Sequence, residues 1–106
     1  MSKPLLYDLG QIDIGAGGTT APFEICFQYG WSLAPTVVGT AGTAKYTVEV
    51  SQDNVTYFDY KTLATLVDIE DAVEDNTFSW SWIRVLVVPG GPSAGTVDFS
   101  LELKSI

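Results

Sequence analysis

The chain has 106 residues, of which 46% are hydrophobic and 17% charged, a balance typical of one folded domain with its own core. Thirteen acids against five scattered basic residues give a net charge of −8. Because neutralising phosphates requires clustered Lys and Arg, this charge argues against binding to nucleic acid or to an anionic membrane. No apolar run approaches the ~20 residues of a membrane span, and the first residues lack the apolar centre of a signal peptide, so we expect a soluble protein made in the cytoplasm.

Hydrophobic and polar residues alternate with a period of two in several segments, and helical spacing is almost absent. This pattern predicts a single all-β domain over residues 1–106. The number and spacing of the turn signals favour an antiparallel β-sandwich or jelly roll of about seven or eight strands.

The first predicted element, residues 5–14, changes phase part-way along. Its hydrophobic residues fall on odd positions before Gly10 and on even positions after it: Leu5, Tyr7 and Leu9, then Ile12 and Ile14. A β-bulge near Gly10 would produce this shift. Two interpretations follow, either one bent strand or a docking arm over residues 1–9 followed by a strand.

Three further segments alternate as half-buried strands do. Their hydrophobic faces consist of Phe23, Ile25, Phe27 and Tyr29, of Tyr46, Val48 and Val50, and of Val97, Phe99, Leu101 and Leu103. Asp53 and Asn54 lie between two β runs and are expected to make a hairpin turn, because both residue types tolerate positive φ. Leu63 to Val73 is the one segment in which a helical turn would fit.

The longest predicted strand, Phe78 to Val88, carries apolar groups on both faces. The branched residues Ile83, Val85 and Val87 are expected to face the core. The opposite face would then present Phe78, Trp80, Trp82 and Arg84. Three interpretations stay open for it: a bulge near Trp82 that turns the aromatics into the core, a surface buried against another subunit or partner, and a platform on which sugars stack.

No residue set supports catalysis. The chain has no His, which removes the common triads and the imidazole metal sites. Five acids lie between Asp68 and Asp75, but Val73 occupies the place where a calcium loop needs Gly, so a solvated loop is favoured over a weak cation site. Cys26 is the only cysteine and has no partner for an intramolecular disulfide. We therefore expect a non-enzymatic protein without a cofactor or a metal.

Three motifs carry a resemblance when taken together: Tyr46-Thr-Val-Glu-Val-Ser-Gln-Asp-Asn-Val-Thr-Tyr57, Trp82-Ile-Arg-Val-Leu-Val87 and Ser93-Ala-Gly-Thr-Val-Asp-Phe99. They resemble discoidin-like, galactose-binding-type β-sandwiches and similar sandwiches of small tailed-phage virion proteins of the capsid-decoration, fibre and tail-associated types. Asn54 stands where the discoidin-like proteins have a turn Gly, and Tyr57 where Trp is common. The chain is shorter than a full discoidin domain, so sugar or lipid binding is not carried over.

The resemblance implies the fold and favours a place in a virion. On this basis we expect a capsid decoration or cement protein on the outer capsid surface, which binds the shell of major capsid protein as a homo-oligomer such as a trimer. The expected partner interface consists of Phe78, Trp80, Trp82 and Arg84, with Leu5, Leu6 and Tyr7 from the N-terminal arm. The alternatives are a phage tail or fibre component that recognises host sugar, and a carbohydrate-binding or adhesion module outside any virus.

Overall fold

A computed structural model describes residues 5–25, 31–66, 70–71 and 81–103, which form nine strands and no helix. The strands are β1 (Leu5–Asp13), β2 (Gly18–Thr19), β3 (Phe23–Glu24), β4 (Trp31–Thr40), β5 (Lys45–Ser51), β6 (Phe58–Leu63), β7 (Glu70–Asp71), β8 (Trp82–Val88) and β9 (Ala94–Leu103). In this part of the chain no helix could cross a membrane.

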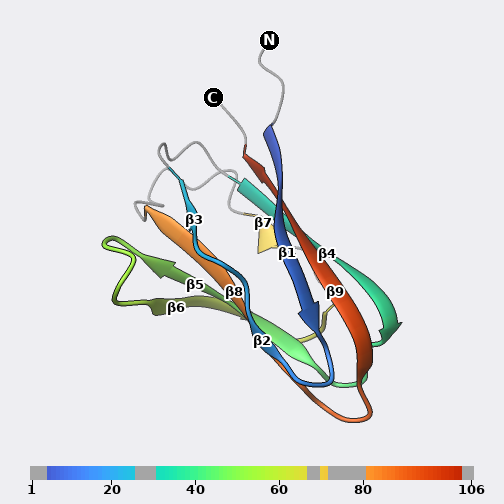
Figure 1. Cartoon of the computed structure of the whole chain (residues 1–106). Coiled ribbons are helices and arrows are strands. Elements are labelled where there is room, and N and C mark those ends of the chain that lie inside the picture. The colour runs from blue at the N-terminus through green and yellow to red at the C-terminus, as the bar shows by residue number, and fades with distance from the viewer. Residues whose placement is uncertain (1–4, 26–30, 67–69, 72–80, 104–106) are drawn as a thin grey trace.

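The strands form two antiparallel sheets that face each other (Figure 1). One sheet has the order β1-β9-β4-β7, and the other has the order β2-β8-β5-β6, with β3 also paired to β8. Between β2 and β3 the chain stays attached to β8, because Thr20 exchanges backbone and side-chain hydrogen bonds with Val85 at 2.9 and 3.0 Å. β2 and β3 therefore act as one interrupted strand.

With β2 and β3 counted together, each strand of the first half pairs with its counterpart from the second half: β1 with β9, β2 and β3 with β8, β4 with β7, and β5 with β6. A long hairpin rolled over on itself gives this nested order, which is that of an eight-stranded jelly roll. The prediction of an all-β antiparallel sandwich or jelly roll is confirmed.

The core lies between the sheets and follows the predicted alternation. Most residues predicted to face inward are buried, and Phe23 is half-buried against the core. The buried ones are Tyr46, Val48 and Val50, then Ile83, Val85 and Val87, then Val97, Phe99 and Leu101. Tyr46 from one sheet and Phe99 from the other meet edge to face, with ring centroids 5.0 Å apart. Ile25 is also buried, whereas Phe27 and Tyr29 lie outside the described residues.

The N-terminal segment is the bent strand rather than the docking arm. β1 pairs with β9 from Leu5 to Asp13, with a register shift between Asp8 and Gly10, where Gly10 has a φ of 112°. Leu9 before the bulge and Ile14 after it are both buried, so the bulge turns both apolar sets toward the core. Residues 5–9 therefore belong to the domain's own sheet, and residues 1–4 lie outside the described residues.

Strand β4 is an element that the sequence pattern did not reveal. It pairs with β9 along its whole length, including Pro35 opposite Phe99. The two-residue strand β7 covers only Ser32 and Leu33, so the rest of β4 is an edge in the described sheet, where proline is tolerated.

The segment from Leu63 to Val73 contains no helical turn in its described part. Residues 64–66 form a bend and turn, and Glu70 and Asp71 form β7 beside β4. The other acids of the run from Asp68 to Asp75 lie outside the described residues, as does Cys26. Among the residues that are described, no group of three His, Cys, Asp or Glu could hold a metal ion.

Candidate interaction surfaces

The outer face of β8 carries the first set of predicted interface residues. β8 pairs with β5 in unbroken register from Val88 to Trp82, so no bulge turns Trp82 inward. Trp82 and Arg84 are half-buried on the outer face while Ile83 between them is fully buried. The bulge interpretation is therefore wrong for Trp82. Phe78 and Trp80 lie outside the described residues.

Arg84 already has two partners within the chain. Glu49 lies directly opposite it on β5, and the Arg84 Nε donates a hydrogen bond to the Glu49 Oε1 at 2.7 Å. The guanidinium also lies 3.8 Å from the ring centroid of Tyr57, in a cation–π contact. The exposed fractions of the two paired side chains are 32% for Arg84 and 14% for Glu49, so the pair is partly withdrawn from water. Part of the cover for the second face of β8 thus comes from the chain itself.

The turn between β5 and β6 is held by a compact network around Ser51 and Asp53. The buried Ser51 Oγ accepts hydrogen bonds from the backbone N–H groups of Asp53 and Asn54 and donates one to Asp53 Oδ1 at 3.0 Å. The same carboxylate oxygen accepts the N–H groups of Val55 and Thr56, both at 2.9 Å. Asn54 has a φ of 61°, which confirms that Asp53 and Asn54 make the hairpin turn.

The surroundings of the hairpin shift the pKa of two of its ionisable groups, Asp53 and Tyr57. The Thr56 and Val55 N–H groups, followed by the Ser51 hydroxyl, lower the pKa of Asp53. Burial raises the pKa of Tyr57 above 10.0, with Glu49 and Asp53 adding to the rise and Arg84 opposing it. Tyr57 is therefore protonated at neutral pH and donates its hydroxyl proton to Asn54 Oδ1 at 2.5 Å.

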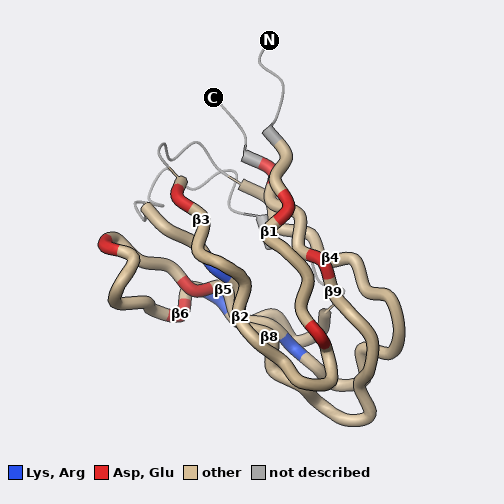
Figure 2. Tube along the Cα trace, viewed as in Figure 1, with Lys and Arg blue, Asp and Glu red and all other residues tan. Residues whose placement is uncertain are grey.

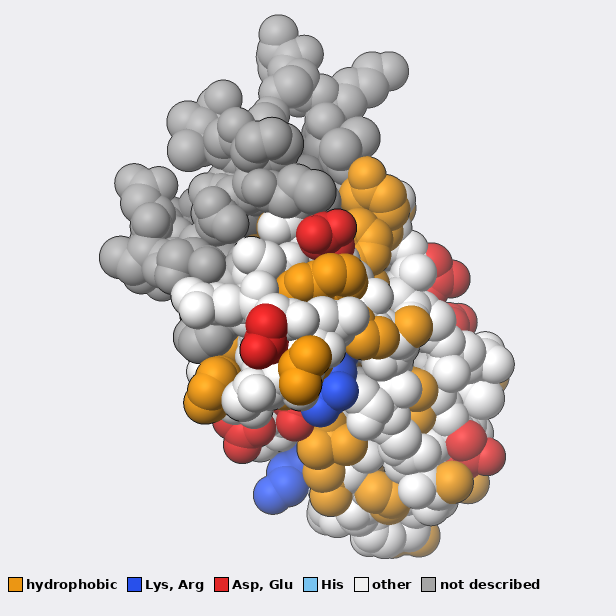
Figure 3. Space-filling model, turned by 60° about the vertical axis from the view of Figure 1, so that its left-hand side comes forward, with side chains coloured by type: hydrophobic (Ala, Val, Ile, Leu, Met, Phe, Trp, Pro, Cys, Tyr) orange, Lys and Arg blue, Asp and Glu red, His pale blue; other side chains and the backbone are white. Residues whose placement is uncertain are grey.

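Two large apolar side chains of the same hairpin point into solvent. Val55 is 80% exposed in the turn, and Phe58, the first residue of β6, is 53% exposed. The hairpin projects from one side of the sandwich (Figure 1), and an acidic group lies at its outer end (Figure 2). On this side of the molecule hydrophobic side chains appear in separate groups with acids beside them (Figure 3). The sequence signal for this feature is an apolar residue, Val55, directly after the predicted turn at Asp53 and Asn54.

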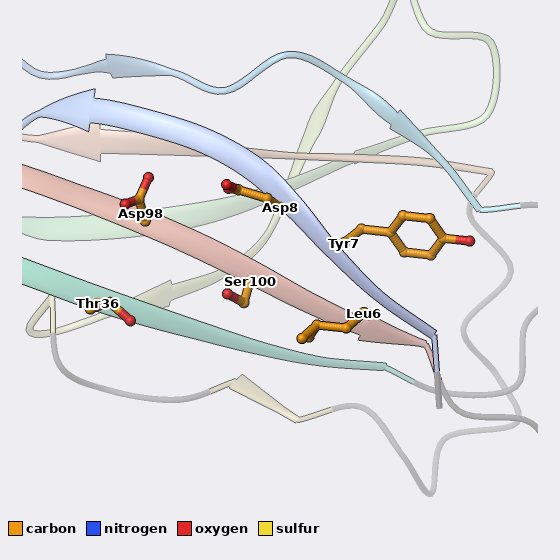
Figure 4. A pocket seen from close by; sticks show the side chains of 6 residues that line it. All are labelled: Leu6, Tyr7, Asp8, Thr36, Asp98 and Ser100. Carbon is orange, nitrogen blue, oxygen red and sulfur yellow. The ribbon is translucent and has the colours of Figure 1, made fainter. Parts of the chain in front are cut away.

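The second predicted set lies on β1, in the other sheet. Leu6 is 70% exposed on the outer face, beside a shallow hollow of about 360 Å³. The hollow is lined by Leu6, Tyr7, Asp8, Thr36, Asp98 and Ser100, from β1, β4 and β9 (Figure 4). The Tyr7 ring turns away from the carboxylates and hydroxyls and packs against Phe23, with ring centroids 4.7 Å apart. Leu5 belongs to β1, but its side chain lies outside the description.

The two predicted sets do not form one surface. Trp82 and Arg84 face outward from the sheet of β8, and Leu6 faces outward from the sheet of β1 on the opposite side of the sandwich. The prediction missed three residues of the β5–β6 hairpin: Tyr57, which lies against Arg84 on the outer face of β8, and the exposed Val55 and Phe58. Comparisons of the chain with protein-family models, with curated proteins and with solved structures found no match.

Proposed function

We propose that the protein is a non-enzymatic virion structural protein of the capsid decoration or cement type. The observation that carries the proposal is the jelly-roll order of the strands, an architecture that viral capsid domains share with lectins. Because a fold alone does not determine function, the surface must supply the rest of the argument.

The described surface has many more acidic than basic residues and a few isolated, exposed apolar side chains. Ten of the thirteen acids but only three of the five basic residues lie in the described segments, and the acids occur on both sheets (Figure 2). An acidic coat of this kind would repel packaged nucleic acid and keep free copies soluble. The exposed apolar side chains Leu6, Val55 and Phe58 lie on β1 and on the β5–β6 hairpin, which belong to different sheets. This distribution supports attachment at several small contacts.

Such contacts suit a repetitive shell. A specific interface buries about 800 Å² per partner, and many copies, or copies joined in a homo-oligomer such as a trimer, gain affinity by binding several sites at once. The mechanism would be mechanical: each copy bridges neighbouring major capsid protein subunits on the outer surface and so opposes their separation.

The test is to mix the purified chain with empty shells of the phage whose genome encodes it. We expect co-sedimentation with the shells and a higher melting temperature of the decorated particles. Deleting residues 1–9 would be a poor probe, because Leu9 is a core residue and the deletion would destabilise the domain. Leu6→Ser is a better one, since its side chain is 70% exposed. Shells that neither bind the protein nor gain stability would refute the proposal.

A sugar-recognising tail or fibre component is the second candidate, because lectins use the same jelly-roll architecture and the Phe58 ring is 53% exposed. This candidate predicts that Trp82→Ala or Phe58→Ala abolishes binding to a glycan array while the assembly state is unchanged. Absence of glycan binding by the intact protein would exclude it.

A further inference from the structure

The β5–β6 hairpin is built as a rigid support for two exposed apolar side chains. Its turn is fixed by backbone N–H hydrogen bonds that the Ser51 and Asp53 side chains accept. The segment after the turn is fixed by Tyr57, which donates a hydrogen bond to Asn54 and lies against Arg84. A loop that is ordered before binding loses little conformational entropy when it binds. Val55 and Phe58 project from this support with most of Val55 and half of Phe58 in solvent.

The charges around the tip indicate what kind of surface it fits. Asp53 and Asp59 flank Val55 and Phe58 and are both exposed, and residues 51–60 contain no basic residue. Exposed apolar side chains with carboxylates next to them in the chain are complementary to an apolar pocket that has Lys or Arg beside it. An anionic membrane would repel the same tip.

A second copy of the chain does not offer such a pocket in its described part. The hollow on the outer face of the other sheet is lined by Asp8 and Asp98, so docking the tip there would place four carboxylates near one another. The basic residues that are described are Lys45, Lys61 and Arg84, and Arg84 is already paired with Glu49. Charge complementarity therefore favours a different protein over self-association.

We propose that the hairpin tip, residues 51–59, is the element that docks into a basic-rimmed apolar pocket on the shell protein. This inference rests on the proposed function and adds to it the contact surface and the chemistry of the partner. Val55 and Phe58 would fill the pocket, and Asp53 and Asp59 would meet its rim. Wild-type binding should therefore weaken as salt is raised, because the rim charges become screened.

The experiment measures the affinity of wild type and variants for the same empty shells by co-sedimentation. We expect Val55→Ser combined with Phe58→Ser to weaken binding at least tenfold, and Asp59→Asn to weaken it several-fold and to reduce its salt dependence. Val38→Ser is the matched control, because Val38 is a similarly exposed valine, at 68%, on the opposite sheet. It should bind within twofold of wild type. Circular dichroism and thermal melting of each variant would show that the fold is retained.

The outcomes separate this inference from the proposed function. Wild-type binding that the Val55/Phe58 variant retains and Leu6→Ser loses would overturn the hairpin inference and leave the decoration function standing. Failure of the wild type to bind shells would overturn both. A concentration-dependent dimer in analytical ultracentrifugation that disappears in the Val55/Phe58 variant would show that the tip binds a second copy, and would overturn the choice of partner.

Discussion

The contact of Arg84 with Glu49 and Tyr57 makes a quantitative prediction about stability. The Nε–Oε1 distance of 2.7 Å and the partial burial of both side chains favour a coupling near the top of the range for surface pairs, about 1 kcal/mol. The cation–π contact with Tyr57 should add about 0.5–1 kcal/mol. We therefore expect Arg84→Met, which keeps an apolar stem, to reduce the free energy of unfolding by about 1.5–2 kcal/mol.

A double-mutant cycle separates these contributions. Arg84→Met, Glu49→Gln and the double variant would be unfolded with urea and followed by tryptophan fluorescence, at low salt and in 1 M salt. The coupling should be about 1 kcal/mol at low salt and should shrink in high salt, since part of the pair is open to water. A second cycle with Tyr57→Leu measures the cation–π part. A coupling below about 0.2 kcal/mol in both cycles would refute the reasoning and would leave Arg84 free to act as an interface residue.

Two further predictions concern the turn and the β4–β9 ladder. Because the folded pKa of Asp53 is lowered, its contribution to stability is present above the ordinary value of 3.8 and is lost as the pH falls through the folded pKa. The difference in free energy of unfolding between wild type and Asp53→Asn should therefore be constant near neutral pH and shrink below about pH 4. An NMR titration that places the midpoint of Asp53 above 3.8 would contradict this. Gly95→Ala should cost more than about 3 kcal/mol or prevent folding, because Gly95 has a φ of 104° and an added Cβ would clash with the backbone carbonyl of Val38. Gly15→Ala, at a position without positive φ and with only ordinary contacts, is its control and should change the melting temperature little.

The features that the sequence predicted correctly are those set by local alternation. In a strand with one buried face, a hydrophobic side chain must recur at every second residue. Tyr46, Val48 and Val50 could therefore be assigned to the core without knowledge of the strands beside them. The bulge at Gly10 was predictable for the same reason, because a phase change within one strand requires an extra residue.

The features that were missed depend on partners distant in sequence. Strand β4 contains Pro35, a residue type that is disfavoured inside strands, and its place in the sheet depends on β9, its partner at the other end of the chain. The docking-arm interpretation of residues 5–9 failed because their pairing partner, β9, lies at the other end of the chain. The position of Tyr57 over Arg84 depends on the register of β5 against β8, which no local pattern specifies.

The intramolecular partners of Arg84 change which surface is best suited to binding. A protein that used the Arg84 guanidinium would first have to displace Glu49 and Tyr57, and a loss of about 1.5–2 kcal/mol corresponds to an affinity roughly 10- to 30-fold weaker. Val55 and Phe58 at the hairpin tip are instead 80% and 53% exposed, and Tyr57, which contacts Arg84, is also bonded to Asn54 of the turn. Substitutions that remove the contacts of Arg84 with Glu49 and Tyr57 should therefore reduce binding at the tip indirectly, because the hairpin that carries Val55 and Phe58 becomes less rigid. The residue that the sequence marked as a contact group is better explained as part of that support.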